Sequence, residues 1–155
     1  MLLPAFYKQV TSHTIEEDNI SIISCNGISY KRYLRVLEGT NKKIAVLTDN
    51  DKDELRISQA KKFNLENKNQ HVFMGKTVDD WTWEVCLIKR NKCVLDELIK
   101  PDENSKYLVN GADIGDKTLG KMLNQKVESA YKILKSNTKL IIPDHICEAI
   151  EWLKK

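Results

Sequence analysis

Short apolar runs that alternate with helix-patterned segments are the feature that most constrains how this chain can fold. The runs lie at residues 20–23, 43–47 and 71–74, and each is followed by apolar residues at helical spacing. Alternating strands and helices are typical of an α/β sheet with mostly parallel strands. The middle run is apolar from Ile44 to Leu47 instead of alternating, which predicts a strand covered on both faces.

The helices expected around this sheet follow from apolar spacing and from breaker residues. An amphipathic helix is expected over residues 2–10, and an Asn26-Gly27 turn should lead into a helix that carries Tyr30 and Leu34. Further helices are expected over 55–63 and from Trp83 onward, followed by a polar loop over 101–117. Two C-terminal helices complete the pattern, one over 119–134 and one that begins at Pro143.

The composition fits one ordinary globular domain, expected to span residues 1–155. Hydrophobic residues make up 41% of the 155 residues and charged residues 30%. Every apolar run is far shorter than the roughly 18 residues that a membrane span needs, and the N-terminus lacks the pattern of a signal peptide. We therefore expect a cytoplasmic protein without membrane contact. The net charge of +3 favours a polyanionic partner only slightly.

Three carboxylates follow the middle apolar run at alternate positions, as Asp49, Asp51 and Asp53. In open parallel sheets, ligands bind beyond the carboxyl ends of the strands. Clustered carboxylates repel one another unless a cation lies among them, and an all-oxygen set suits Mg²⁺ or Mn²⁺. A solvated turn that caps the next helix explains the same pattern, so the sequence leaves both interpretations open.

Two further residues extend the candidate site. Glu84 lies in the first turn of the helix after the third apolar run, which directs it to the same edge of the sheet, although acidic residues are common at helix N-termini. Lys126 falls in the middle of the apolar stripe of the expected helix over 119–134, where an unpaired lysine is costly. It either extends to solvent or pairs with a carboxylate and phosphate site.

Other motifs give less support to a function. The segment after Asp49 lacks the glycine and glutamate of an EF-hand. Residues 115–121 approach a P-loop, but Met122 stands where a Mg²⁺-binding Ser or Thr is required, so we expect no nucleotide cofactor. The three histidines, at positions 13, 71 and 145, are far apart in sequence and are expected at the surface or at edges.

Taken in order, these segments resemble the C-terminal Toprim domain of OLD-family ATP-dependent endonucleases, a group that includes antiphage nucleases. The resemblance extends through nearly the whole chain and implies a Toprim-like, mostly parallel sheet flanked by helices. It rests on the following segments: Leu2-Leu3-Pro4-Ala5, Asn26-Gly27 with Tyr33-Leu34, Val46-Leu47-Thr48-Asp49-Asn50-Asp51, Thr82-Trp83-Glu84, Lys126 with Ala130, Ile142-Pro143, and Ile150-Glu151-Trp152-Leu153.

The resemblance implies roles for four residues. Asp49 and Asp51 are similar to the D-x-D metal ligands, and Glu84 is similar to the acidic residue of the T-x-E segment. Lys126 is similar to the lysine near the scissile phosphate, so Lys126, Asp49 and Asp51 would be catalytic. Apart from the resemblance, Asp53 is within reach of the same edge and would stand behind these residues. The implied reaction is DNA phosphodiester hydrolysis with two Mg²⁺ or Mn²⁺ ions.

The chain also departs from the family pattern. The E-G-x-S/T-E motif and its strand, which precede the first helix in the family, are absent from this sequence, as is the ATPase half. We therefore expect an N-terminally truncated Toprim-like domain that is weak or inactive as an endonuclease when alone. Its partners would be DNA and either a separate ATPase subunit or further copies of the chain. The alternative is a non-catalytic Toprim domain that binds DNA or protein.

Overall fold

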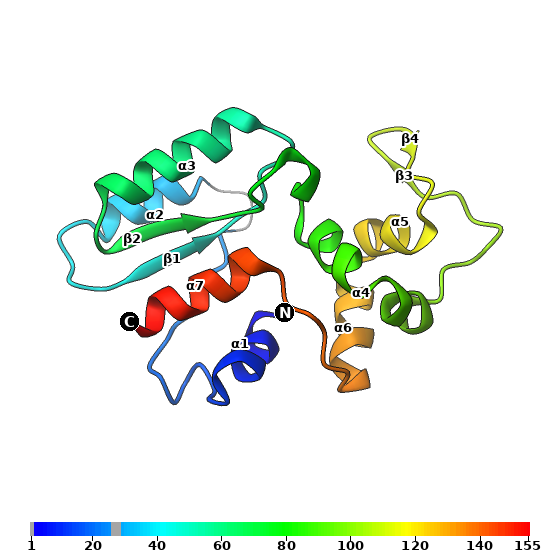
Figure 1. Ribbon diagram of the computed structural model, residues 1–155, viewed down its shortest axis with the longest axis horizontal. Coiled ribbons are helices and arrows are strands. Elements are labelled where there is room, and N and C mark those ends of the chain that lie inside the picture. The colour runs from blue at the N-terminus through cyan, green and yellow to red at the C-terminus, as the bar shows by residue number, and fades with distance from the viewer. Residues whose placement is uncertain (1, 26–28) are drawn as a thin grey trace.

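A two-stranded parallel sheet organises the first half of the chain (Figure 1). The computed structural model describes residues 2–25 and 29–155. Strand β1 (Ile44–Leu47) pairs with β2 (Gln70–Phe73), with Val46 opposite Val72. Helix α3 (Glu54–Glu66) makes the crossover that parallel strands require. The expected α/β class with parallel strands is confirmed.

Helices cover both faces of this sheet. α2 (Tyr30–Val36) and α3 lie on one face, and α7 (Asp144–Lys154) lies on the other with α1 (Leu3–Thr11) beyond it (Figure 1). The α3 side is a small core of Ile57, Ala60, Val72 and Met74, whereas α1 and α7 join a larger core. The expectation that β1 is covered on both faces is confirmed (Figure 1), although all four of its residues are only half-buried.

A helical cluster follows the sheet along the chain. α4 (Trp83–Ile99), preceded by a 3₁₀ turn at Val78–Asp80, packs against α5 (Lys117–Asn124) and α6 (Lys126–Ser136). Leu95, Ile99 and Met122 are almost fully buried there. The expected loop over 101–117 contains a short hairpin, β3 (Leu108–Val109) with β4 (Ala112–Asp113). No helix in the described part of the chain is long and apolar enough to cross a membrane.

The strand expected over residues 20–23 does not form. These residues have no regular secondary structure, and Ile22 and Ile23 are 49% and 59% exposed. The backbone N–H of Ile20 donates to the carbonyl of Ile15, which ties this segment to the preceding turn. A β-branched run becomes a strand only when a neighbouring strand accepts its hydrogen bonds. The Asn26-Gly27 turn expected next lies outside the described residues.

The helix expected over 119–134 is divided in two. Gln125 has φ −127° and ψ 54°, and this non-helical residue separates α5 from α6. Lys126 therefore begins a helix instead of lying in the middle of an apolar stripe, and its side chain is 54% exposed. Val127, which continues the apolar pattern, is 70% exposed for the same reason. The prediction that Lys126 faces the core is wrong because the change of direction at Gln125 turns it away.

Candidate functional site at the carboxyl end of β1

The turn that follows β1 carries the predicted carboxylates in an unusual backbone conformation. Asp51 and Lys52 both have positive φ, 53° and 65°, a left-handed conformation that costs energy for residues other than glycine. The turn ends at Asp53, whose side chain accepts hydrogen bonds from the backbone N–H groups of Leu55 and Arg56 at the start of α3. Asp53 is thus the helix cap that the sequence left open as an alternative.

Asn50 holds this turn in place, and its importance was missed in the sequence. Its side chain is fully buried. The side-chain amide nitrogen lies 3.0 Å from the carbonyl oxygen of Gly75 and 2.8 Å from that of Thr77, while the amide oxygen accepts from the N–H of Lys52 at 2.9 Å. These bonds join the turn after β1 to the loop after β2. A polar residue between two aspartates gives no sequence signal that separates such an anchor from a solvated turn residue.

Asp49 and Glu84 converge at the edge formed by this turn. Glu84 lies in the first turn of α4, as expected, and Thr82 caps that helix by accepting from the N–H of Val85. A carboxylate oxygen of Asp49 accepts from the N–H of Trp83 at 3.2 Å, which fixes Asp49 beside the start of α4. Lys126, at the start of α6, places its Nζ 3.1 Å from Oε1 of Glu84. The structure therefore brings three of the four predicted site residues together.

The electrostatics of this group are unusual for surface carboxylates. Burial, reinforced by the charge of Glu84, raises the pKa of Asp49 to about 6, and Lys126 partly offsets that rise. The Glu84 side chain is only 16% exposed. Its Oε2 is buried and has no hydrogen-bond partner in the described part of the chain. A buried carboxylate oxygen without a partner is costly, and a cation or a water molecule would satisfy it.

Asp51 does not join this group. Its carboxylate forms an ion pair with Arg56, and its side chain is 61% exposed. Consequently, among residues 2–25 and 29–155, no three His, Cys, Asp or Glu side chains lie close enough together to hold a metal ion. Of the three carboxylates predicted to form the site, Asp49 and Glu84 therefore converge, and Asp51 is paired with Arg56.

Two carboxylates nevertheless fit a magnesium ion. Mg²⁺ is commonly held by one or two carboxylates, with waters and substrate phosphates as its remaining ligands. Asp49 and Glu84 supply that number, and the partnerless Oε2 of Glu84 is an available ligand atom. Asp51 would add a third carboxylate after release from Arg56. The donor set suits a hard cation such as Mg²⁺ or Mn²⁺.

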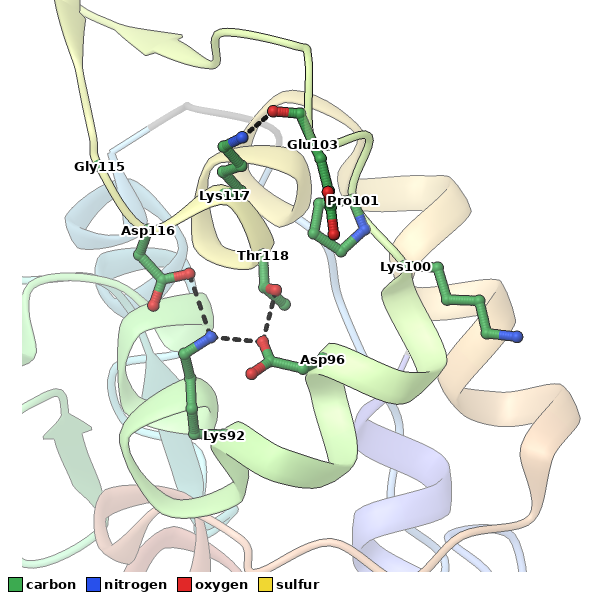
Figure 2. A pocket seen from close by; sticks show the side chains of 9 residues that line it. All are labelled: Lys92, Asp96, Lys100, Pro101, Glu103, Gly115, Asp116, Lys117 and Thr118. Atoms are coloured by element: carbon green, nitrogen blue, oxygen red, sulfur yellow. Dashed lines mark hydrogen bonds and ion pairs between the residues drawn. The ribbon is translucent and has the colours of Figure 1, made fainter.

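A cavity lies farther along α4, apart from the group of Asp49, Glu84 and Lys126 (Figure 2). It encloses about 630 Å³ between α4, α5 and the loop that joins them. Lys92 pairs with Asp96 and with Asp116, and the hydroxyl of Thr118 donates to Asp96 at 2.5 Å. Because these charges already compensate one another, the cavity presents a structural ion-pair network.

The P-loop-like segment borders this cavity without forming a phosphate cradle. Residues from Lys117 onward belong to α5, and the ammonium of Lys121 donates to the carbonyl of Lys100 at the end of α4, at 3.1 Å. Met122 is 2% exposed and packs in the core. Lys121 therefore stabilises a helix end instead of pointing into an open loop.

The histidines differ from expectation at one position. His13 is exposed and lies 3.1 Å from Asp18, and His71 is half-buried and stacks on Trp152 at 4.5 Å between ring centroids. His145, however, is 5% exposed, and burial lowers its pKa. Its ring meets that of Trp83 edge-on, so it belongs to the packing between α7 and the start of α4. The expectation that it lies at the surface or at an edge is wrong because its ring is packed against Trp83.

Comparison with known proteins finds a family model that matches the N-terminal third of the chain. Residues 1–51 match the family model described as "Overcoming lysogenization defect protein-like, TOPRIM domain". The matched segment includes β1 and ends within the turn that carries Asp49 and Asp51. No curated protein and no solved structure matches the chain. The match confirms the family resemblance over residues 1–51, and the resemblance of the segments beyond residue 51 stays a prediction.

Proposed function

We propose that this chain is a Mg²⁺- or Mn²⁺-dependent DNA endonuclease module, and the match of residues 1–51 to the Toprim domain model of OLD-like proteins supports this proposal. The observation that supports it most is the convergence of Asp49 and Glu84 from separate elements beside Lys126. Asp49 and Glu84 would hold the cation, and Asp51 would join them. Lys126 would contact the phosphate that is cleaved.

The metal ion, when bound, would activate water and stabilise the charge that develops on the phosphate. The side chains of Asp49, Glu84 and Lys126 would make the remaining contributions. Asp49 and Glu84 are each partly buried, and the lower dielectric constant around them strengthens the attraction of their carboxylates for a cation. Lys126 is half-exposed, so its ammonium can leave Glu84 for a phosphate oxygen, and a positive charge there is worth most as negative charge accumulates in the transition state.

Metal binding is the first test of this proposal. Isothermal titration of Mn²⁺ into the intact chain should give a binding isotherm that Asp49→Asn and Glu84→Gln each weaken by at least about tenfold, since each removes one ligand. Asp53→Asn is the matched control, because it removes a charge from the same turn while keeping a side chain that caps α3. Equal loss in the control and in the site variants would contradict the assignment.

Cleavage is the second test. With Mn²⁺ present, the chain should nick supercoiled DNA slowly, and Lys126→Ala should lower that rate while circular dichroism shows an unchanged fold. Single-stranded and duplex DNA serve as parallel substrates. A chain that binds Mn²⁺ through Asp49 and Glu84 and yet cuts none of the three substrates would exclude hydrolysis by this module.

One observation favours a second candidate function, a non-catalytic Toprim module that binds DNA or protein. Asp51 is engaged by Arg56, so two carboxylates, fewer than a two-metal reaction requires, converge at the site. Arg56→Ala distinguishes the candidates. Release of Asp51 should strengthen Mn²⁺ binding and raise cleavage if the module is a nuclease, and it should change neither if the module only binds.

A further inference from the structure

The positive charge of this chain is concentrated in one short segment. Residues 30–43 contain five basic residues and one acidic residue, whereas the whole chain contains 25 basic and 22 acidic residues. This segment therefore carries more than the entire net charge of +3. It consists of α2 and the connection from α2 to β1.

The basic residues of α2 share its outer side. The side of α2 that faces the sheet carries Leu34, which is 5% exposed, together with the half-buried Tyr30 and Tyr33. The opposite side carries three exposed residues, Lys31, Arg32 and Arg35. Within the described part of the chain, none of these three side chains forms an ion pair. We call these three residues the α2 basic face.

The direction of α2 places one end of this face at the edge of the sheet where Asp49 lies. Tyr30, the first residue of α2, packs in the small core that contains Met74, which follows β2. Farther along the helix, the carbonyl of Leu34 accepts from the side chain of Gln70, the first residue of β2. α2 therefore runs antiparallel to the strands, beginning at their carboxyl edge and ending at their amino edge.

We propose that the α2 basic face binds the phosphate backbone of nucleic acid and leads it to the Asp49 and Glu84 site. The link to that site rests on the proposed nuclease function, but the surface itself rests on charge and exposure. The seven residues of α2 span about 10 Å. One strand of a DNA duplex carries a phosphate about every 3.4 Å along the helix axis, so about three phosphates per strand fall within that length, as many as the cations.

The packing of α2 argues against a lipid surface as the partner. A helix that binds a membrane inserts its apolar side among the lipids. The apolar side of α2 is already packed on the sheet, and Val36, 81% exposed, is the large apolar residue that α2 leaves uncovered. The α2 basic face therefore offers charge without an apolar surface to insert, which suits phosphates held in water.

Salt-dependent DNA binding tests this proposal without the metal site. Affinity of the intact chain for a labelled DNA duplex is measured in EDTA over a range of salt concentrations. The triple variant Lys31→Ala, Arg32→Ala, Arg35→Ala should bind at least about tenfold more weakly, and the slope of log affinity against log salt should fall by about 2 to 3, near 0.9 per lost phosphate contact.

The control is a second triple variant, Lys8→Ala, Lys135→Ala, Lys139→Ala. It removes the same charge from exposed positions on α1, on α6 and after α6, away from α2 (Figure 1). It should leave the slope unchanged. Equal weakening by both triples, or no DNA binding by the parent chain, would overturn the proposal. So would binding to vesicles of phosphatidylcholine and phosphatidylserine that depends on the α2 basic face while DNA binding does not.

DNA binding by the α2 basic face and metal binding by Asp49 and Glu84 can be tested separately. The triple variant of the α2 basic face should give the same Mn²⁺ isotherm as the parent chain, because none of its three side chains is among the carboxylates that would bind the ion. If the parent chain binds DNA in EDTA through the α2 basic face but does not bind Mn²⁺, the metal site alone is contradicted. If the parent chain binds Mn²⁺ but its DNA binding does not depend on the α2 basic face, the α2 basic face alone is contradicted.

Discussion

Glu84 and Lys126 form an ion pair of 3.1 Å that joins the first turn of α4 to the first residue of α6. The two partners differ in environment, because the Glu84 side chain is 16% exposed and that of Lys126 is 54% exposed. The pair is thus open to solvent on the lysine side and closed on the carboxylate side. This arrangement keeps the ammonium of Lys126 beside the buried carboxylate of Glu84 and leaves the lysine side chain free to move.

The first prediction concerns this pair. Lys126→Met should lower the free energy of unfolding by no more than about 1 kcal/mol, because pairs with one exposed partner contribute little. Urea denaturation followed by circular dichroism measures the change. Lys126→Arg, which keeps the charge, should restore most of the stability. A loss several times larger would mean that Lys126 is a structural residue.

The second prediction concerns the pH dependence of stability in EDTA. The pKa of Asp49 is raised to about 6, so the folded protein holds this proton more tightly than the unfolded chain does. The contribution of Asp49 to stability therefore falls as pH rises from about 4 to about 6 and is then constant. Above pH 7, Asp49→Asn should be more stable than the parent chain by about 1 kcal/mol, after allowance for partial exposure.

Thermal unfolding at a series of pH values tests this second prediction, with Asp53→Asn as the control. The advantage of Asp49→Asn should vanish below about pH 4, where Asp49 is protonated in both states. An advantage that persists at low pH would come from a source other than the charge of Asp49.

The third prediction concerns Asn50. Replacement by Ala leaves the buried carbonyls of Gly75 and Thr77 without their donor and should cost about 2 to 4 kcal/mol of unfolding free energy. Asn50→Asp should also destabilise, because a carboxylate cannot donate. Asn41→Ala, at an exposed position, should change stability by less than about 0.5 kcal/mol. Chemical denaturation distinguishes these outcomes, and a similar effect at Asn50 and Asn41 would refute the anchoring role.

The fourth prediction concerns nucleotides. The chain should not hydrolyse ATP, because Lys121 is bonded to the end of α4 and Met122 is part of the core. Lys121→Ala should reduce stability slightly through the loss of its bond to the carbonyl of Lys100. A phosphate-release assay provides the check, and an ATPase rate that disappears in Lys121→Ala would prove the prediction wrong.

Local patterns were sufficient to predict most of the elements and one edge of the site. The apolar run Ile44–Leu47, the helix that begins near Trp83 and the helix after Pro143 are all present. Because the carboxyl ends of parallel strands meet at one edge, the order of elements alone predicted that Asp49 and Glu84 would be neighbours. The spacing of apolar side chains indicates whether a segment is a helix or a strand, and these predictions depended mainly on that local information.

The tertiary structure decided what depends on distant partners. The run over 20–23 has strand-forming residues and no strand to pair with, and the apolar pattern over 119–134 continues through the break at Gln125. Spacing likewise could not show that Asp51 pairs with Arg56 or that Asn50 is the buried anchor. The sequence by itself determined which residues lie at the carboxyl end of β1. Hydrogen bonds and ion pairs to other elements decided which of these residues take part in the site. The spacing of residues along the sequence carries no information about the energies of those distant contacts.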